Sequence, residues 1–252
     1  MKKRGQVSLF VILAIVIVAL IVLTFIFYPR IESFIGSEDS PNTFLKRCIE
    51  PAIQESVETL SKQGGYANPE GFILYKGERV KYLCYTAQYY IPCYVQQPLL
   101  RAHFENELEN LIEDKANECV GEMRSYYDER GYQISGGLEP EANVKVNLNN
   151  IAVNLELDLA LTKDTTRRYD NIEFGYDSQM YSLLMTAVSI IDFESTYGDS
   201  ETLDYVRYYP NLKIGKYKLG DGSTVYELED VRTGEMFTFA SRSLAWPGGL
   251  GL

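Results

Sequence analysis

The sequence predicts an α+β protein in which one N-terminal transmembrane helix precedes an exported domain of helices packed on antiparallel sheet. Residues 7–28 form an apolar run that contains no charge, glycine or proline. After this run, segments with helical periodicity and segments that alternate apolar and polar residues occur in separate blocks. Because the blocks lack the regular strand–helix–strand alternation that builds a parallel sheet, the α+β class is favoured.

The apolar run is long enough to cross a membrane. A helix over residues 7–28 is about 33 Å long at about 1.5 Å per residue, and the hydrocarbon core of a bilayer is about 30 Å thick. The basic residues 2–4 precede the run and a net acidic stretch follows it. Since basic flanks stay in the cytoplasm, we expect the chain from residue 30 onward to lie outside the cell membrane. Residues 25–29 contain no small-residue cleavage site, so we expect the helix to be kept as a signal anchor.

A second feature of the N-terminus is the sequence Lys3-Arg4-Gly5, which stands directly before Gln6 and the apolar run. Over about the first 28 residues this arrangement resembles the class III signal peptide of type IV pilin-like proteins, including the archaeal ones. The resemblance implies that a membrane peptidase cuts between Gly5 and Gln6, and that the helix remains as an anchor or packs into the core of a filament. Phe10 stands where this family commonly has a glutamate, five residues into the mature helix. A plain uncleaved anchor is the alternative interpretation.

Charge narrows the choice of partners. The chain of 252 residues has a net charge of −11, and without the three basic residues at positions 2–4 the remainder carries −14. An acidic surface repels phosphate backbones, so nucleic acid is disfavoured as a partner. The expected partners are the lipid bilayer and either another protein or a second copy of this chain, bound through the transmembrane helix.

All four cysteines follow the apolar run, on the side that we expect to be exported. An even number there indicates two disulfides, although four cysteines allow three connectivities and free thiols are the alternative. Cys48 and Cys119 fall on the apolar stripes of two predicted helices, so a bridge between them is the natural pairing and leaves Cys84 with Cys93. A zinc site is disfavoured because there is no C-x-x-C pair and His103 is the only histidine.

The first half of the exported chain has the pattern of two helices that flank a hairpin. Ser40 and Pro41 are typical of a helix start, and Gly64-Gly65 and Gly131 are typical of helix ends. The elements predicted from these signals and from the apolar spacing are a helix at 41–63, strands at 72–75 and 80–90, and a long helix from 97–98 to 131.

The second half changes to strands. Asn149-Asn150 separates two runs that alternate at period two, Asp177 is the expected cap of one further helix, and Gly198 is its expected end. The predicted strands are 144–148, 151–161, 167–174, 212–219, 224–228 and 236–240.

A soft boundary is expected near Gly136 to Pro140, where the helical half gives way to strands. The expected division of the chain is a cytoplasmic basic segment at 1–6, a transmembrane helix at 7–28, a linker at 29–40, a disulfide-stapled helical and hairpin subdomain at 41–137, an α+β and mainly antiparallel subdomain at 138–245, and a flexible tail at 246–252.

The chain contains no recognisable catalytic motif. His103 stands alone on a predicted helix, the serines form no G-x-S-x-G elbow, and the glycines form neither a P-loop nor a dinucleotide fingerprint. Carboxylates are abundant, but abundance does not place two of them at a catalytic separation. We therefore expect no catalytic residue, no metal site and no cofactor.

The twenty tyrosines are a compositional excess, and several of them are concentrated around two of the cysteines. Tyrosine supplies rigid, amphipathic contact area, so an exposed cluster would form a recognition surface. The alternative is that tyrosine is simply a good strand former whose alternate members are buried. The candidate residues are Tyr82, Tyr85, Tyr89, Tyr90 and Tyr94.

Three hypotheses for function follow. The first is a non-enzymatic, single-pass cell-surface protein whose exported domain has a structural or partner-binding role. The second is a pilin-like filament subunit that is cut after Gly5. The third is a membrane-tethered hydrolase with an unrecognised carboxylate site.

Overall fold

The computed structural model describes residues 17–18, 40–137 and 139–245. The predicted cleavage site at Gly5 and Gln6, the tail at 246–252, and all but a few residues of the predicted anchor and linker lie outside the described residues. Within the described ranges, no helix has both the length and the apolar character needed to cross a bilayer. The chain divides into two compact units, Met1–Thr43 and Phe44–Leu252.

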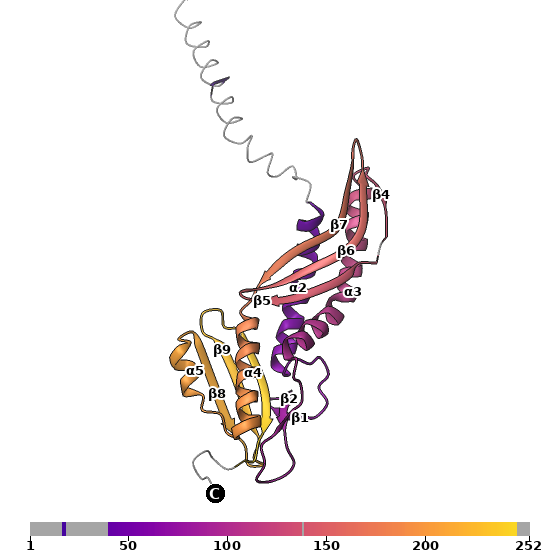
Figure 1. Cartoon of the computed structure of the whole chain (residues 1–252). Helices are drawn as coiled ribbons and strands as arrows, with labels where there is room; N and C mark the ends of the chain where they lie inside the picture. The colour runs from indigo at the N-terminus through magenta and orange to yellow at the C-terminus, as the bar shows by residue number, and fades with distance from the viewer. Residues whose placement is uncertain (1–16, 19–39, 138, 246–252) are drawn as a thin grey trace, which may run out of the picture. The chain divides into compact units, whose positions relative to one another are not determined.

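The described chain has the α+β class that the sequence predicts, with helices and strands arranged as in Figure 1. Its elements in order are α2 (Pro41–Lys62), β1 (Phe72–Tyr75), β2 (Glu78–Tyr85), β3 (Tyr94–Val95), α3 (Leu100–Asp128), β4 (Gln133–Ser135), β5 (Glu141–Asn147), β6 (Asn150–Thr162), β7 (Thr166–Asp177), α4 (Met180–Tyr197), α5 (Leu203–Tyr208), β8 (Leu212–Lys218), β9 (Thr224–Asp230) and β10 (Met236–Arg242).

The strands form two sheets. The larger sheet has the order β1-β2-β10-β9-β8, with β3 added beside β2, and the smaller sheet consists of β6 flanked by β5, β4 and β7. All pairs are antiparallel except one: β10 runs parallel to β2. The expectation of an antiparallel sheet was therefore wrong for the larger sheet, which is mixed. Hairpin patterns report only on neighbouring strands, and these two strands are far apart in the sequence.

The strands on either side of the expected boundary near Gly136 to Pro140 are interleaved. β2 of the first segment pairs with β10 of the second, and β4 of the first segment pairs with β6 of the second. Each sheet therefore contains strands from both 41–137 and 138–245, and Phe44–Leu252 forms one unit.

Turn and cap residues act locally as the sequence predicts in most places. The Ser40 hydroxyl accepts the backbone N–H of Thr43 at 3.3 Å and so caps α2. The two-residue turn between β1 and β2 consists of Lys76 and Gly77, both with positive φ, as a hairpin with the right-handed twist of its strands requires. Gly198, with φ 97°, ends α4.

Other local predictions were wrong or incomplete. Asp177 is the last residue of β7, and the Ser178 hydroxyl instead accepts the N–H of Met180 at 3.0 Å. The second strand of the first hairpin ends at Tyr85 instead of continuing to Tyr90, because the chain turns away into a loop closed by a disulfide. The short elements β3, β4 and α5 gave no periodic pattern long enough to be predicted.

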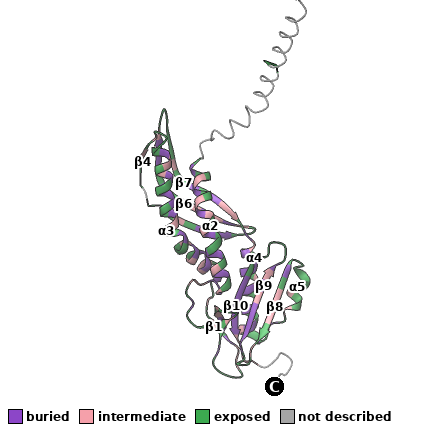
Figure 2. Ribbon diagram, turned by 180° about the vertical axis from the view of Figure 1, so that it is seen from behind, coloured by how far each residue is buried: buried purple, intermediate pink, exposed green. Residues whose placement is uncertain are grey.

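The core lies between the helices and the sheets, and Figure 2 shows that α5, by contrast, is largely exposed. The apolar stripe of α3 packs against the face of the smaller sheet through residues such as Phe104, Leu108 and Ile112, all fully buried. Disulfide bonding is confirmed: Cys48 on α2 is bonded to Cys119 on α3, with 5.9 Å between their Cα atoms.

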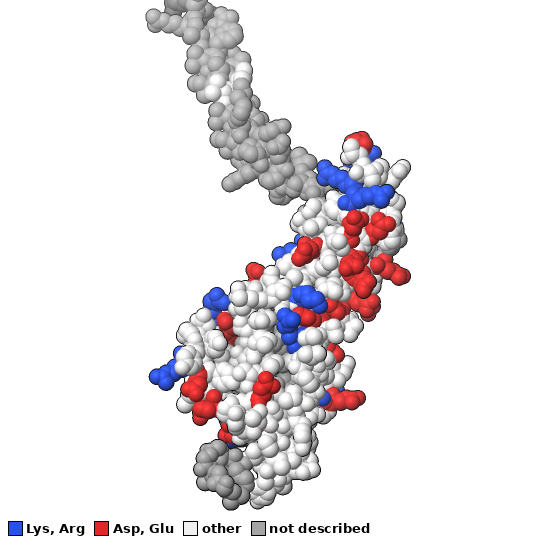
Figure 3. Space-filling model, viewed as in Figure 1, with Lys and Arg blue, Asp and Glu red and all other residues white. Residues whose placement is uncertain are grey.

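Two acidic side chains of α3 close the edge of the smaller sheet. Carboxylate oxygens of Glu105 and Glu109 accept the N–H groups of Val146 and Val144 on β5, at 2.9 Å and 2.8 Å. Residues four apart on a helix are separated by about 6 Å along its axis, and residues two apart on a strand by about 6.7 Å, so the two spacings match. The carboxylates therefore satisfy edge donors that would otherwise be open to another strand. Figure 3 shows other acidic side chains that are exposed over α3.

We predict that removal of the interhelical bridge is more costly than removal of the loop bridge. The two bridges close segments with sequence separations of 71 and 9 residues. By loop entropy, the Cys48→Ala/Cys119→Ala variant should lose about 4 kcal/mol of unfolding free energy and the Cys84→Ala/Cys93→Ala variant about 3 kcal/mol. Urea unfolding of both double variants beside the wild type measures this. A larger loss of unfolding free energy in the Cys84→Ala/Cys93→Ala variant would contradict the conclusion that the disulfide between α2 and α3 contributes more to stability.

Candidate functional site

The candidate recognition site is a loop between β2 and β3 that carries four exposed tyrosines. We call residues 85–94 the tyrosine loop. A disulfide between Cys84 and Cys93 closes its base, with 5.4 Å between their Cα atoms, and both cysteines are buried. Pairing of Tyr85 with Tyr94 across β2 and β3 adds a short ladder at the same place. The ends of the loop are therefore fixed both covalently and by backbone hydrogen bonds.

The middle of the tyrosine loop is fixed to the chain at and after the end of β10. The N–H of Thr86 donates to the carbonyl of Arg242 at 2.9 Å, and the N–H of Tyr90 donates to the carbonyl of Leu244 at 3.1 Å. Tyr90 has a φ of 67°, a left-handed conformation that is uncommon for a bulky residue and persists where the surroundings hold it. These bonds give the loop one defined conformation.

Four of the five tyrosines that the sequence singles out are exposed. The exposed fractions are 69% for Tyr89, 69% for Tyr90, 67% for Tyr94 and 38% for Tyr85. Tyr82 is different: it is half-buried, its hydroxyl is 2.8 Å from the Ser223 hydroxyl, and burial raises its pKa. Tyr82 therefore supports the sheet, and the other four rings are exposed.

Arg242 supports the loop from β10, a role that no sequence pattern predicts. One guanidinium nitrogen donates to the carbonyl of Thr86 at 2.5 Å, and Nε donates to the carbonyl of Asp221 at 3.1 Å. The guanidinium carbon lies 5.8 Å from the ring centroid of Tyr85. Arg242 thus joins the tyrosine loop to the turn between β8 and β9 and holds one ring of the surface in place.

His103, the only histidine, packs against a tyrosine ring. Its ring contacts that of Tyr66 with centroids 3.9 Å apart and planes tilted by 43°, and burial lowers the pKa of the imidazole. Its Nε2 is 4.0 Å from the Glu107 carboxylate, too far for a hydrogen bond, and makes no hydrogen bond within the described residues. Among the described residues, no group of three or more His, Cys, Asp or Glu is arranged to hold a metal ion.

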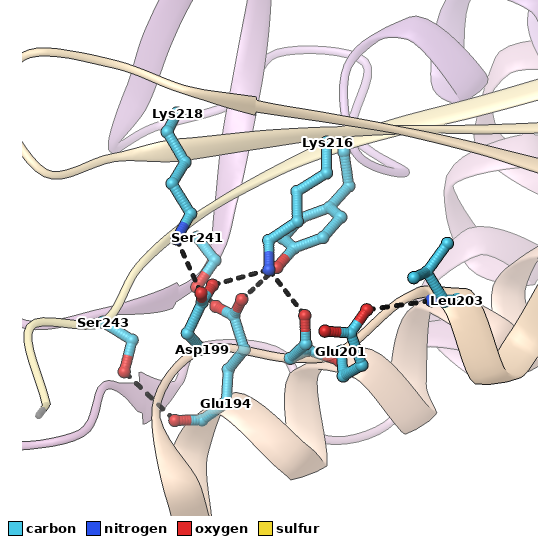
Figure 4. A network of polar contacts seen from close by, with 10 residues as sticks. Glu194, Asp199, Glu201, Leu203, Lys216, Lys218, Ser241 and Ser243 are labelled. Carbon is cyan, nitrogen blue, oxygen red and sulfur yellow. Dashed lines mark hydrogen bonds and ion pairs between the residues drawn. The ribbon is translucent and has the colours of Figure 1, made fainter. Parts of the chain in front are cut away.

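A buried polar network lies at the end of α4 (Figure 4). Its centre is Glu194, only 2% exposed, whose two carboxylate oxygens accept hydrogen bonds from the hydroxyls of Tyr226 on β9 and Ser241 on β10. The backbone carbonyl of Glu194 accepts from the Ser243 hydroxyl at 3.1 Å. The network therefore fastens α4 to the C-terminal strand, next to the residues that hold the tyrosine loop.

Charged groups surround this centre on one side. Lys216 and Lys218 of β8 each place an ammonium 2.6 Å from the carboxylate of Asp199, and Lys216 also donates to the carbonyl of Ser200 at 2.5 Å. Burial raises the pKa of Glu194, and hydrogen bonds from Ser241 and Tyr226 and the charge of Lys216 offset this in part. Partial burial would also raise the pKa of Asp199, but its two lysine partners outweigh this effect and lower it. At 2% exposure the Glu194 carboxylate is closed to solutes, so it serves structure.

The helical spacing of α4 includes a stripe that places Glu194 on the buried face, and the sequence prediction did not recognise it. The buried stripe of α4 runs through Leu183, Ala187 and Ile190 to Glu194, so the carboxylate occupies an apolar position of the helix. A charged residue at such a position needs buried partners. The partners come from distant strands, which the helix pattern does not reveal.

An open groove of about 650 Å³ gives little support to hydrolase chemistry. Carboxylates line it, but the Glu58 side chain bonds Lys62 at 2.6 Å and the Glu227 side chain bonds Lys76 at 2.6 Å. The hydrogen bond from Lys62 lowers the pKa of Glu58, which is the wrong direction for a general acid. Glu58 and Glu227 are therefore members of surface ion pairs in this groove.

We predict that the Glu194→Gln variant changes the pH dependence of stability. Where the protonated acid has a hydroxyl oxygen that can still accept a hydrogen bond, the new amide has an NH2 group that only donates, so the unfolding free energy should fall by about 1 to 3 kcal/mol near pH 4.5. The folded pKa of Glu194 is raised from 4.5, so the folded state binds the proton more tightly than the unfolded state. That stabilisation is fully present below pH 4.5 and is lost as the pH rises through the folded pKa. The wild type's advantage over the variant should therefore shrink as the pH rises in urea titrations, and a constant or growing advantage would refute the assignment.

Comparison with family models, with curated protein sequences and with solved structures finds no match to this chain. The interpretation of the site therefore depends on the geometry of its own residues.

Proposed function

We propose that the protein is a non-enzymatic, single-pass membrane-anchored cell-surface protein whose extracytoplasmic domain binds a partner through the tyrosine loop. One observation carries the proposal: four tyrosines are exposed on a loop that a disulfide and backbone hydrogen bonds hold rigid. Rigid aromatic side chains lose little conformational entropy on binding, and tyrosine is enriched in recognition surfaces. A surface fixed before binding avoids the ordering cost that a flexible loop would incur.

The membrane anchor in this proposal is supported by sequence. Residues 7–28 are apolar and of spanning length, and the basic residues 2–4 favour a cytoplasmic N-terminus. Two disulfides and no free cysteine in the described chain agree with maturation in an oxidising compartment. The domain after the anchor would then face the cell exterior.

A binding role is favoured over an enzymatic one by what surrounds the tyrosine loop. The groups that hold the loop are hydroxyls, a guanidinium and backbone N–H and carbonyl groups. The Glu194 side chain is buried, and the neighbours of His103 are Tyr66 and Glu107, which lie outside the loop segment. Such a set offers contact area and hydrogen bonds but no nucleophile with an adjacent base.

The pilin-like filament subunit is the second candidate, and the Lys3-Arg4-Gly5 sequence before Gln6 favours it. In that case the apolar helix would pack with copies of itself, and the exported domain would lie on the filament surface. The mass of the native N-terminus separates the two: a chain that begins at Gln6 selects processing, and one that retains residues 1–5 selects the plain anchor.

We predict that the tyrosine loop cross-links to its partner and that loss of two rings abolishes this. A photoreactive phenylalanine at exposed Gln88 of the full chain, expressed in its own cells, should yield one discrete adduct. The Tyr89→Ser/Tyr94→Ser variant should lower the affinity by about 30-fold or more, since central aromatic contacts contribute at least about 2 kcal/mol.

The matched control is the Tyr208→Ser/Tyr209→Ser variant at the end of α5, where the rings are 78% and 61% exposed. This control should keep the adduct. Equal loss in both variants, or no adduct from Gln88 in intact cells, would contradict recognition by the tyrosine loop.

A further inference from the structure

A row of aromatic rings lies at the end of the domain where the chain enters it. Phe44 of α2 contacts Tyr126 of α3 with ring centroids 5.1 Å apart, and Tyr126 is followed by Tyr127 at 5.2 Å and then Tyr132 at a further 5.4 Å. The disulfide between Cys48 and Cys119 holds the two helices together near this row. The rings therefore form one row, in which Tyr127 is buried and Phe44, Tyr126 and Tyr132 are partly exposed.

Basic side chains lie over the faces of these rings. The three pairs are Arg47 over Phe44 at 5.8 Å, Arg130 over Tyr126 at 3.6 Å and Lys163 over Tyr132 at 4.9 Å, each measured from the cationic group to the ring centroid. A cation over an aromatic face is attracted to the ring. Arg130 also donates to the backbone carbonyl of Tyr126 at 2.9 Å.

The turn between β6 and β7 extends this basic surface. Pairing of Ile134 on β4 with Leu161 on β6 keeps the turn beside Tyr132, and Arg167 and Arg168 of β7 are exposed next to it. Figure 3 shows basic side chains gathered near the tip of this hairpin. We call the rings together with segments 44–47, 124–132 and 163–168 the aromatic–basic band.

The charge of the band is opposite to that of the chain as a whole. Its three segments contain seven basic and three acidic residues, whereas the whole chain contains 24 basic and 35 acidic residues. The three acidic residues are Asp128, Glu129 and Asp164. An anionic surface would therefore repel most of the domain but attract this end.

Tyrosine with arginine or lysine is the combination that suits a membrane surface. Tyrosine rings are enriched at the level of lipid headgroups, where one end is apolar and the other is hydrated. Basic side chains near an anionic leaflet gain from its negative potential. Neither property requires the band to enter the hydrocarbon core.

The covalent connection brings this end near a membrane if the predicted anchor is present. Phe44 is the first residue of the compact unit, and the predicted linker of twelve residues at 29–40 spans at most about 40 Å when fully extended. A tether this short gives the band a high effective concentration at the bilayer surface.

We propose that the aromatic–basic band is a membrane-docking surface that binds the anionic lipid headgroups of the bilayer that holds the anchor. The inference rests on the anchor of the proposed function. Docking through this band would restrain the domain beside the membrane and leave the tyrosine loop free for its partner.

The test uses the full chain in nanodiscs that hold one chain each, made of phosphatidylcholine alone or of phosphatidylcholine with phosphatidylglycerol. Amide hydrogen exchange within residues 163–168 should be at least about fivefold slower in the anionic discs, since each basic side chain near an anionic surface contributes roughly fivefold to partitioning. High salt should remove the difference because it screens the attraction.

Charge-reversal variants test whether the lipid-dependent protection comes from the aromatic–basic band or from the net charge of the chain. The Lys163→Glu/Arg167→Glu/Arg168→Glu variant should lose the lipid-dependent protection. The Arg79→Glu/Arg207→Glu variant, with two exposed arginines outside the band, should keep it.

The outcomes that would overturn the inference are distinct. Equal exchange in both lipids, in a chain that has inserted, refutes docking and leaves the anchor standing. Protection that appears only when two chains share a disc indicates contact with a second copy and also refutes lipid docking. A chain that inserts into neither disc refutes the anchor and, with it, the inference that depends on it.

Discussion

The parallel pairing of β2 with β10 is the constraint on which the arrangement of this domain depends. It joins strands that lie far apart in the described chain, with Cys84 beside Ser241 and Tyr85 beside Arg242. Because β10 then lies at the base of the tyrosine loop, the residues that follow it can accept the loop's N–H groups. The same strand carries Ser241, which donates to Glu194 and ties α4 to the sheet. One non-local strand pair therefore positions both the candidate recognition surface and the buried network beneath it.

The smaller sheet is held by α3 and by the disulfide between Cys48 and Cys119. The helix α3 covers its face with apolar side chains and its edge with the carboxylates of Glu105 and Glu109, and the bridge from Cys119 to Cys48 adds α2 to the same layer. An acidic residue on this helix can thus be structural, surface-exposed or both. The number of acidic residues does not distinguish these roles. The position of each carboxylate relative to β5 distinguishes them.

Much of the local structure could be predicted because it depends on local chemistry. Ser40, Gly77 and Gly198 act through their own backbone or through residues within one turn of them, so single-sequence signals suffice. The parallel strand pair and the role of Arg242 depend on contacts between residues 156 to 158 positions apart, which no periodic pattern records. On α4 the apolar residues surround most of the helix, and Phe193, which a helical stripe would include, is 38% exposed while Glu194 is buried. The period therefore allows more than one buried face, and the stripe that ends at Glu194 is one of them. For the tyrosines, composition identified the cluster, but only the structure separated Tyr82 from the four exposed rings.

We propose that this domain matures outside the cytoplasm as the exposed part of an anchored surface protein. The redox state of its cysteines in native material tests this proposal. Protein should be isolated from its own cells with free thiols blocked at lysis, digested without reduction, and mapped by mass spectrometry. The account predicts two linked peptide pairs, one joining Cys48 to Cys119 and one joining Cys84 to Cys93. Recovery of four blocked thiols would contradict it, because a reduced domain indicates a reducing compartment.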